Sequence, residues 1–135
     1  MNTRSQSAKC IRIVAGLITD AAGRVLLVRK HGTSAFMQPG GKSEPNEAAH
    51  ETLAREIREE LGCPVSDGSF QYKGRFVAEA ANEPEYEVDA EIFAVQLIGK
   101  PVAQAEIAEL VWLPVNNPDG LPLAPLTRDH ILPLI

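Results

Sequence analysis

The amino-acid sequence predicts a single α+β domain in which helices cover a mixed β-sheet. The chain has 135 residues, which suits one domain with a real hydrophobic core. Segments with strand character outnumber those with helical character, and one long helical segment separates two groups of strands. No internal repeat appears in the sequence, so a solenoid is excluded.

Several segments have the composition and alternation of β-strands. They are rich in β-branched and aromatic residues, and they span residues 10–19, 25–30, 70–79, 85–97 and 110–115. Turn-forming residues 20–23 connect the first two segments and residues 80–84 connect the third and fourth, so we expect two hairpins. A short extended piece at residues 36–38 ends at Pro39-Gly40-Gly41.

One segment, residues 48–61, has strong helical character. It is rich in Ala, Glu, Leu and Arg, contains no Gly or Pro, and ends at Gly62. Near the end of the chain, Thr127 is expected to cap a second, short helix that runs through Leu132. Residues 116–125 form a Pro-rich connection before that helix and do not resemble a domain linker.

Composition and charge restrict the classes of function. Hydrophobic residues make up 44% and charged residues 23%, as in soluble globular proteins. The net charge of −5 argues against binding to a nucleic acid polymer, and no apolar run is long enough to cross a membrane. Residues 1–9 are polar and predict a flexible tail with no secretory signal. Cys10 and Cys63 are expected to be free thiols in a reducing cytoplasm.

Acidic residues cluster on one side of the predicted helix. At 100° per residue, Glu56, Glu59 and Glu60 project within about 100° of one another, beside the apolar stripe. Like charges at this spacing repel one another, so a counter-charge must offset them. Mg²⁺ and Mn²⁺ prefer such oxygen ligands. The helix alone also fits a solvated face stabilised by ion pairs.

The loop before the helix decides between these two interpretations. From Gly41 to Cys63 the sequence follows the spacing G-x5-E-x7-R-E-U-x-E-E-x-G-U, where U is an aliphatic residue. The fixed identities would coincide by chance on the order of once in a billion positions. The segment therefore resembles the box that defines the Nudix hydrolases. The last position departs from the pattern, because Cys63 replaces Ile, Leu or Val; we expect a change in packing only.

The resemblance implies the fold, the reaction and most of the site. The fold would be the α/β/α sandwich of that family, formed by residues 10–135. The reaction would be attack of water on a phosphorus of a nucleoside diphosphate linked to another group, with Mg²⁺ or Mn²⁺ as cofactor. The box residues implied to bind metal are Glu56, Glu59, Glu60 and Gly41. Those implied to have structural roles are Glu47, Arg55 and Gly62. Glu56 and Glu59 are also candidate catalytic residues, with Glu56 as the general base or as the residue that orients it.

Further candidates lie outside the box. Many family members place another acid on a later loop, as a ligand or base, and either Glu106 or Glu109 matches that location; we favour Glu109 as catalytic. Arg29 and Lys42 are candidates for binding the terminal phosphates. Phe36, in the loop before the box, is the candidate for stacking on a base.

The leading hypothesis is a cytoplasmic hydrolase of phosphoanhydride bonds in nucleoside triphosphates or other nucleoside diphosphate derivatives. Its partner would be a small-molecule nucleotide, and the resemblance leaves a homodimer open. One alternative is an ADP-ribose or nucleotide-sugar pyrophosphatase, although the proline expected downstream of the box in many ADP-ribose enzymes is absent from residues 77–79. A second is a non-catalytic nucleotide-sensing Nudix domain. A third, an unrelated acidic interaction domain, does not explain the glycine loop.

Overall fold

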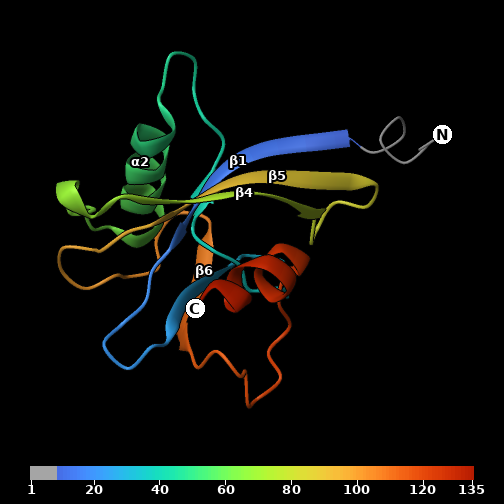
Figure 1. Ribbon diagram of the computed structural model, residues 1–135. Helices are drawn as coiled ribbons and strands as arrows, with labels where there is room; N and C mark the ends of the chain where they lie inside the picture. The colour runs from blue at the N-terminus through green and yellow to red at the C-terminus, as the bar shows by residue number, and fades with distance from the viewer. Residues whose placement is uncertain (1–8) are drawn as a thin grey trace.

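The structure is a computed structural model that describes residues 9–135, and its strands form two sheets (Figure 1). The larger sheet has the strand order β3-β1-β5-β4. Its strands are, in chain order, β1 (Lys9–Leu17), β3 (Gly40–Gly41), β4 (Gln71–Glu79) and β5 (Tyr86–Ala94). β1 runs parallel to β5, whereas the β1–β3 and β4–β5 pairs are antiparallel, which confirms the predicted mixed sheet. The predicted flexible tail lies outside the described residues, except for Lys9, which begins β1.

The smaller sheet pairs β2 (Val25–Lys30) with β6 (Ile107–Leu113) in antiparallel orientation. The predicted hairpin between residues 10–19 and 25–30 forms only at its turn, where Thr19 and Val25 make an antiparallel bridge and the Leu26 amide donates to the Ile18 carbonyl at 2.8 Å. Beyond the turn, β2 pairs with β6 and not with β1. Each residue from Val25 to Val28 is at most 1% exposed. A strand buried on both faces belongs at the centre of a layered fold, not in an isolated hairpin. The second predicted hairpin is confirmed by the pairing of β4 with β5.

The long helix, α2 (Ala49–Leu61), lies where the sequence predicts it. Gly62 ends it in a left-handed conformation (φ 71°), and the Gly62 amide donates to the Arg58 carbonyl at 2.9 Å. On the side of α2 that faces the strands, Leu53 and Ile57 are fully buried in the core. The helix thus presents an apolar stripe to the core and leaves its polar side for the loop before it.

The end of the chain is helical, but its first turn differs from the prediction. η2 (Thr127–Ile131) is a turn of π-helix and η3 (Leu132–Leu134) is a 3-10 turn. Thr127 does not cap the segment: Leu126 holds that position, and Thr127 is fully buried inside the turn. Its hydroxyl instead donates to Oε1 of Gln38 at 2.9 Å, so it bonds to a residue far away in the sequence. A further short 3-10 turn, η1 (Asp67–Ser69), was not predicted.

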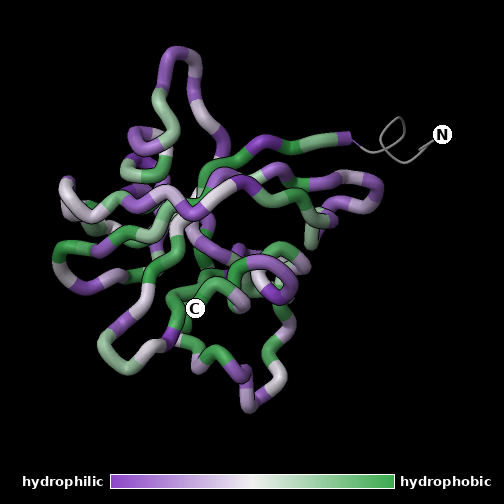
Figure 2. The backbone as a smooth tube through the Cα atoms, in the orientation of Figure 1, coloured by the Kyte–Doolittle hydropathy of each residue, from purple (hydrophilic) through white to green (hydrophobic). Residues whose placement is uncertain are grey.

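Two hydrophobic cores lie on opposite faces of the strands. α2 covers one core, and the C-terminal segment η2–η3 covers the other (Figure 1). β2 contributes to both, with Leu26 and Val28 in the α2 core and Val25 and Leu27 in the other. The α/β/α arrangement is therefore confirmed. The loop between β3 and α2 and the β4–β5 turn are mainly hydrophilic (Figure 2).

Both cysteines carry free thiols, as predicted; Cys10 is exposed, and Cys63 is buried among core residues like a small hydrophobic side chain. None of the helices in residues 9–135 is long and apolar enough to cross a membrane.

The double burial of β2 predicts a large loss of stability when Leu27 is shortened. Leu27→Ala should reduce the free energy of unfolding by about 2–5 kcal/mol, because the cavity would form where the side chain is fully buried. Urea denaturation measures this change. Val77→Ala, at a position 49% exposed on β4, is the control and should cost less than about 1 kcal/mol. Equal losses in the two variants would contradict the central position of β2.

Candidate active site

The loop that leads into β3 is pressed against β1. Gly40 has a φ of 154°, and a Cβ added there would stand 2.1 Å from the Val14 carbonyl oxygen. Gly40 pairs with Ala15 in the sheet, and the Gly16 amide donates to the Pro39 carbonyl at 2.9 Å. Because any side chain at position 40 would overlap the β1 backbone, this approach requires glycine.

Gly41 leaves room for a carboxylate of α2. A Cβ at Gly41 would lie 2.5 Å from Cδ of Glu56, so the Glu56 carboxylate rests directly on the loop backbone. Burial is the largest influence on Glu56 and raises its pKa, against the lowering effect of Arg55. A carboxylate with a raised pKa is a stronger base than a free glutamate, which suits proton transfer.

Glu60 is the most buried acid of the site. Its residue is 1% exposed, and its Oε1 accepts a hydrogen bond from the Gly40 amide at 3.1 Å. Burial raises the pKa of Glu60 to about 8, although the bond from Gly40 opposes the shift. The nearby charge of Glu56 adds to the rise. A carboxyl group in this state holds its proton near neutral pH unless a cation takes its place.

Arg55 is the hydrogen-bonding centre of the loop. Its Nε and Nη2 donate to the two carboxylate oxygens of Glu47 at 2.8 and 3.0 Å, a bidentate pair. Nη1 donates to Glu56 at 3.1 Å, and Nη2 also donates to the Lys42 carbonyl at 3.0 Å. The bonds from Arg55, followed by one from the Glu44 amide, lower the pKa of Glu47 to about 2. These contacts tie the loop to α2.

Glu59 is more exposed than the other two acids. Its side chain is 54% exposed and accepts a hydrogen bond from Arg55 Nη1 at 3.4 Å. Across residues 9–135, no three His, Cys, Asp or Glu side chains stand close enough to form a ready metal-binding group. The donors at the loop still fit a hard cation, because Glu56 and Glu60 present carboxylate oxygens. Mg²⁺ keeps several waters or phosphate oxygens, so one or two protein carboxylates are enough to hold it.

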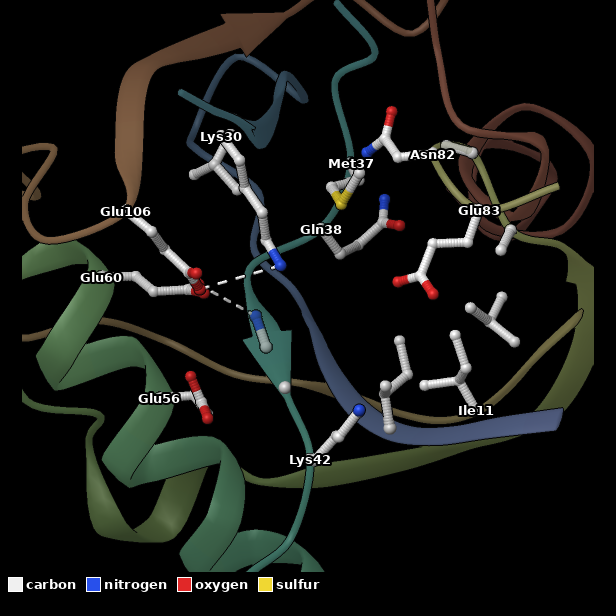
Figure 3. Close-up of a pocket in the computed structure, with 17 residues that line it drawn as sticks. Ile11, Lys30, Met37, Gln38, Lys42, Glu56, Glu60, Asn82, Glu83 and Glu106 are labelled. Atoms are coloured by element: carbon white, nitrogen blue, oxygen red, sulfur yellow. Dashed lines mark hydrogen bonds and ion pairs between the residues drawn. The ribbon is translucent and has the colours of Figure 1, made fainter. Parts of the chain in front are cut away.

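A cleft with a volume of 340 Å³ opens beside these acids (Figure 3). Its charged lining includes the box acids Glu56 and Glu60 and, from other segments, Lys30, Lys42 and Glu106. Nζ of Lys30 lies 3.7 Å from Oε1 of Glu106. Figure 3 shows Lys30 and Glu106 extending toward Glu60, and the charge of Glu106 raises the pKa of both Glu56 and Glu60. Carboxylates and ammonium groups therefore face one cleft, an arrangement suited to a metal-bound phosphate.

Of the candidate site residues predicted outside α2, some line the cleft and others lie away from it. Lys42 and Glu106 line the cleft. Arg29 and Glu109 pair with each other at 2.8 Å (Nε to Oε1), and neither is among the described residues of the cleft lining. Phe36 is 5% exposed and packs in the core beneath the C-terminal segment, so its ring contacts core side chains. Of the two later acids that were predicted, Glu106 lines the cleft and Glu109 does not; Glu83, from the turn between β4 and β5, also lines it.

Four polar residues of the cleft lining were missed in the sequence: Lys30, Gln38, Asn82 and Glu83. Leu26 and Val28 face the α2 core, so the two-residue period of a strand places Lys30 on the same side, next to the glutamates. That signal was present in the sequence. Gln38 had no such signal, because its orientation depends on Thr127, at the other end of the chain.

The fold and the box have counterparts among known proteins. The chain matches the family model of the NUDIX domain over residues 11–135. An uncharacterized Nudix hydrolase of Bacillus subtilis, YvcI, is 29% identical over 120 residues, covering 88% of this chain and 75% of that protein. The CTP pyrophosphohydrolase of Escherichia coli is 36% identical over 66 residues, covering 46% of this chain and 48% of that enzyme. A crystal structure of a MutT NUDIX hydrolase from Burkholderia pseudomallei superposes with a TM-score of 0.79 at 22% identity, covering 94% of this chain and 98% of that one.

The raised pKa of Glu60 predicts how stability changes with pH when a chelator removes metal. The folded protein keeps the Glu60 proton up to about pH 8, whereas the unfolded chain releases it near the ordinary glutamate pKa of 4.5. Between these values the folded state binds more protons, so stability falls as pH rises. Glu60→Gln, which is always neutral, should gain roughly 1–5 kcal/mol relative to wild type between pH 5 and pH 9.

Urea denaturation at the two pH values measures this gain. Glu59→Gln is the matched control, because the same substitution at a half-exposed position of α2 removes no buried carboxyl group. A gain of equal size in the two variants would contradict the assignment to Glu60.

Proposed function

Because this chain belongs to the NUDIX family of hydrolases, we propose that it hydrolyses a phosphoanhydride bond in nucleoside triphosphates or related nucleoside diphosphate derivatives. The observation that carries the proposal is the buried Glu60 carboxylate, held by the Gly40 amide in the same cleft as Glu56, Lys30 and Lys42. Burying a carboxylate without a bound cation lowers the stability of the fold. A buried acid in a cleft is therefore expected to have a functional role.

We propose that Glu56 and Glu60 hold Mg²⁺ or Mn²⁺, and that Glu59 joins them by exchanging its bond to Arg55 for the cation. When bound there, the cation would neutralise phosphate oxygens and lower the pKa of the attacking water. Glu60 would give up its proton and hold the cation as a charged carboxylate. Gly41 supports this arrangement by letting the loop backbone come close to the carboxylates.

The remaining side chains have roles that follow from their positions. Lys30 and Lys42 line the cleft and would donate hydrogen bonds to phosphate oxygens. The Arg55–Glu47 pair braces the loop, so that the carboxylates keep their positions when the phosphates bind. Glu106 would take the proton of the attacking water, because it lies in the cleft and its charge acts on both Glu56 and Glu60.

The substrate class is supported by the relatives. The matching segment of the CTP pyrophosphohydrolase of Escherichia coli favours a nucleoside triphosphate over ADP-ribose or a nucleotide sugar. Retention of every acid of the box favours an enzyme over a nucleotide sensor. We also keep the cytoplasm as the proposed compartment, since both thiols are free.

A panel of substrates tests the proposal. Wild type should release phosphate or pyrophosphate from at least one nucleoside triphosphate, ADP-ribose or nucleotide sugar, and only with Mg²⁺ or Mn²⁺. Glu59→Gln and Glu60→Gln should each lower kcat/KM by about 10–100-fold or more, because each removes a charged ligand. Colorimetric detection of the released phosphate provides the measurement. Binding without turnover on every substrate would establish the sensor instead, and the absence of both binding and metal dependence would favour the interaction domain.

The assignment of Glu106 has its own test. Glu106→Gln should lower kcat by about 10²–10⁴-fold, because a general base contributes on that scale. Glu109→Gln is the matched control: its carboxylate bonds to Arg29 outside the cleft lining, so kcat should change by less than about threefold. A larger loss in Glu109→Gln than in Glu106→Gln would overturn the assignment.

A further inference from the structure

Gln38 carries a buried hydrogen-bond donor that nothing satisfies in the described structure. The residue is 6% exposed, and its Oε1 accepts the Thr127 hydroxyl at 2.9 Å. Its Nε2 is buried and, within residues 9–135, has no hydrogen-bond partner. Buried amide groups in native proteins nearly always have partners, because an unpaired donor is costly. The N–H groups of Gln38 therefore require a partner from outside the described part of the chain, either a ligand or an ordered water.

The orientation of this amide is set by the C-terminal segment. Thr127 is fully buried in η2, and its hydroxyl directs Oε1 of Gln38 toward that segment. The amide nitrogen is thereby left on the side of the cleft, where Figure 3 shows it among the lining residues. Because the protein has already ordered this donor, little conformational entropy is lost when a ligand bonds to it.

The amide lies in an apolar recess that continues the cleft. The recess has a volume of 60 Å³. It shares Ile13, Met37, Val88 and Gln38 with the cleft that holds the glutamates. Its walls are mostly apolar, and its polar residues are Gln38, Thr127 and Glu79. Mostly apolar walls with a few fixed polar groups are typical of sites for flat aromatic ligands. With the phosphates beside Glu56 and Glu60, the base of the same nucleotide would extend toward this recess.

We propose that Nε2 of Gln38 donates a hydrogen bond to a carbonyl oxygen on the edge of the nucleobase remote from the sugar, so that the site selects guanine and uracil over adenine and cytosine. Guanine (O6) and uracil (O4) carry an acceptor at that edge, whereas adenine and cytosine carry an amino group. An amino group would place two donors face to face and leave both unpaired. The inference rests on the proposed function, because it takes a nucleotide as the ligand.

An ordered water is the competing partner for this donor. The recess exceeds the roughly 10–15 Å³ that one water requires, so a water could satisfy Nε2 without any role for Gln38 in recognition. The two explanations predict different effects when the chemistry of the side chain is changed.

Binding of nucleoside monophosphates tests the proposal without depending on hydrolysis, because these compounds contain no phosphoanhydride bond. Isothermal titration calorimetry of wild type with GMP, UMP, AMP and CMP should show GMP and UMP binding at least about tenfold more tightly than AMP and CMP, respectively. Gln38→Met should abolish this preference. Gln38→Glu, which replaces the donor with an acceptor, should reverse it.

Matched controls separate recognition from general damage. Gln96→Met and Gln96→Glu make the same changes at an exposed glutamine outside the cleft lining, and they should keep the wild-type preference. Thr127→Val removes the hydroxyl that orients Gln38 and should weaken the preference while thermal unfolding still shows a folded protein.

Equal binding of the four monophosphates by wild type, or an unchanged preference in both Gln38 variants, would overturn the proposal and leave a bound water as the partner. Failure to bind any monophosphate would overturn it as well. A protein that binds GMP selectively but cleaves no substrate would retain the inference about Gln38 and refute the proposed hydrolase.

Discussion

The site depends on the fit of two glycines between β1 and α2. A side chain at Gly40 would collide with the Val14 carbonyl, and one at Gly41 would collide with the Glu56 carboxylate. Because neither position carries a Cβ atom, the loop backbone fits closely between β1 and α2. The Gly40 amide can then donate to the Glu60 carboxylate. The positions of Glu56 and Glu60, the acids proposed to bind metal, therefore depend on this one close approach.

The charges of the loop are balanced in two different ways. Arg55 pairs with Glu47 and also reaches Glu56, so these acids are compensated within the protein. Glu60 is compensated by a proton when no cation is present, as its pKa of about 8 indicates. Glu47, whose two carboxylate oxygens both bond to Arg55, maintains the loop. Among residues 9–135, Glu60 has no arginine partner, and its carboxylate is the one best placed to exchange a proton for a cation.

The sequence could predict what is encoded locally. The helix at residues 48–61 and its end at Gly62 follow from composition and capping, and the helical wheel placed Glu56, Glu59 and Glu60 together beside the apolar stripe. Pairing between distant segments had no local signal. The parallel partnership of β1 with β5 and the choice of Glu106 over Glu109 depend on how strands meet in three dimensions. The prediction for Phe36 was wrong about its surroundings, because its burial requires the C-terminal segment to pack over it.

The bond between Thr127 and Gln38 joins residues 89 positions apart, and only Gln38 lies near the box. Catalysis and choice of base would thus be encoded in different parts of the chain. Substitutions in the C-terminal segment that redirect the Gln38 amide would alter which base is held, while the glycine loop and its glutamates remain as they are. In this chain, the preferred base would thus change through residues that take no part in the reaction chemistry.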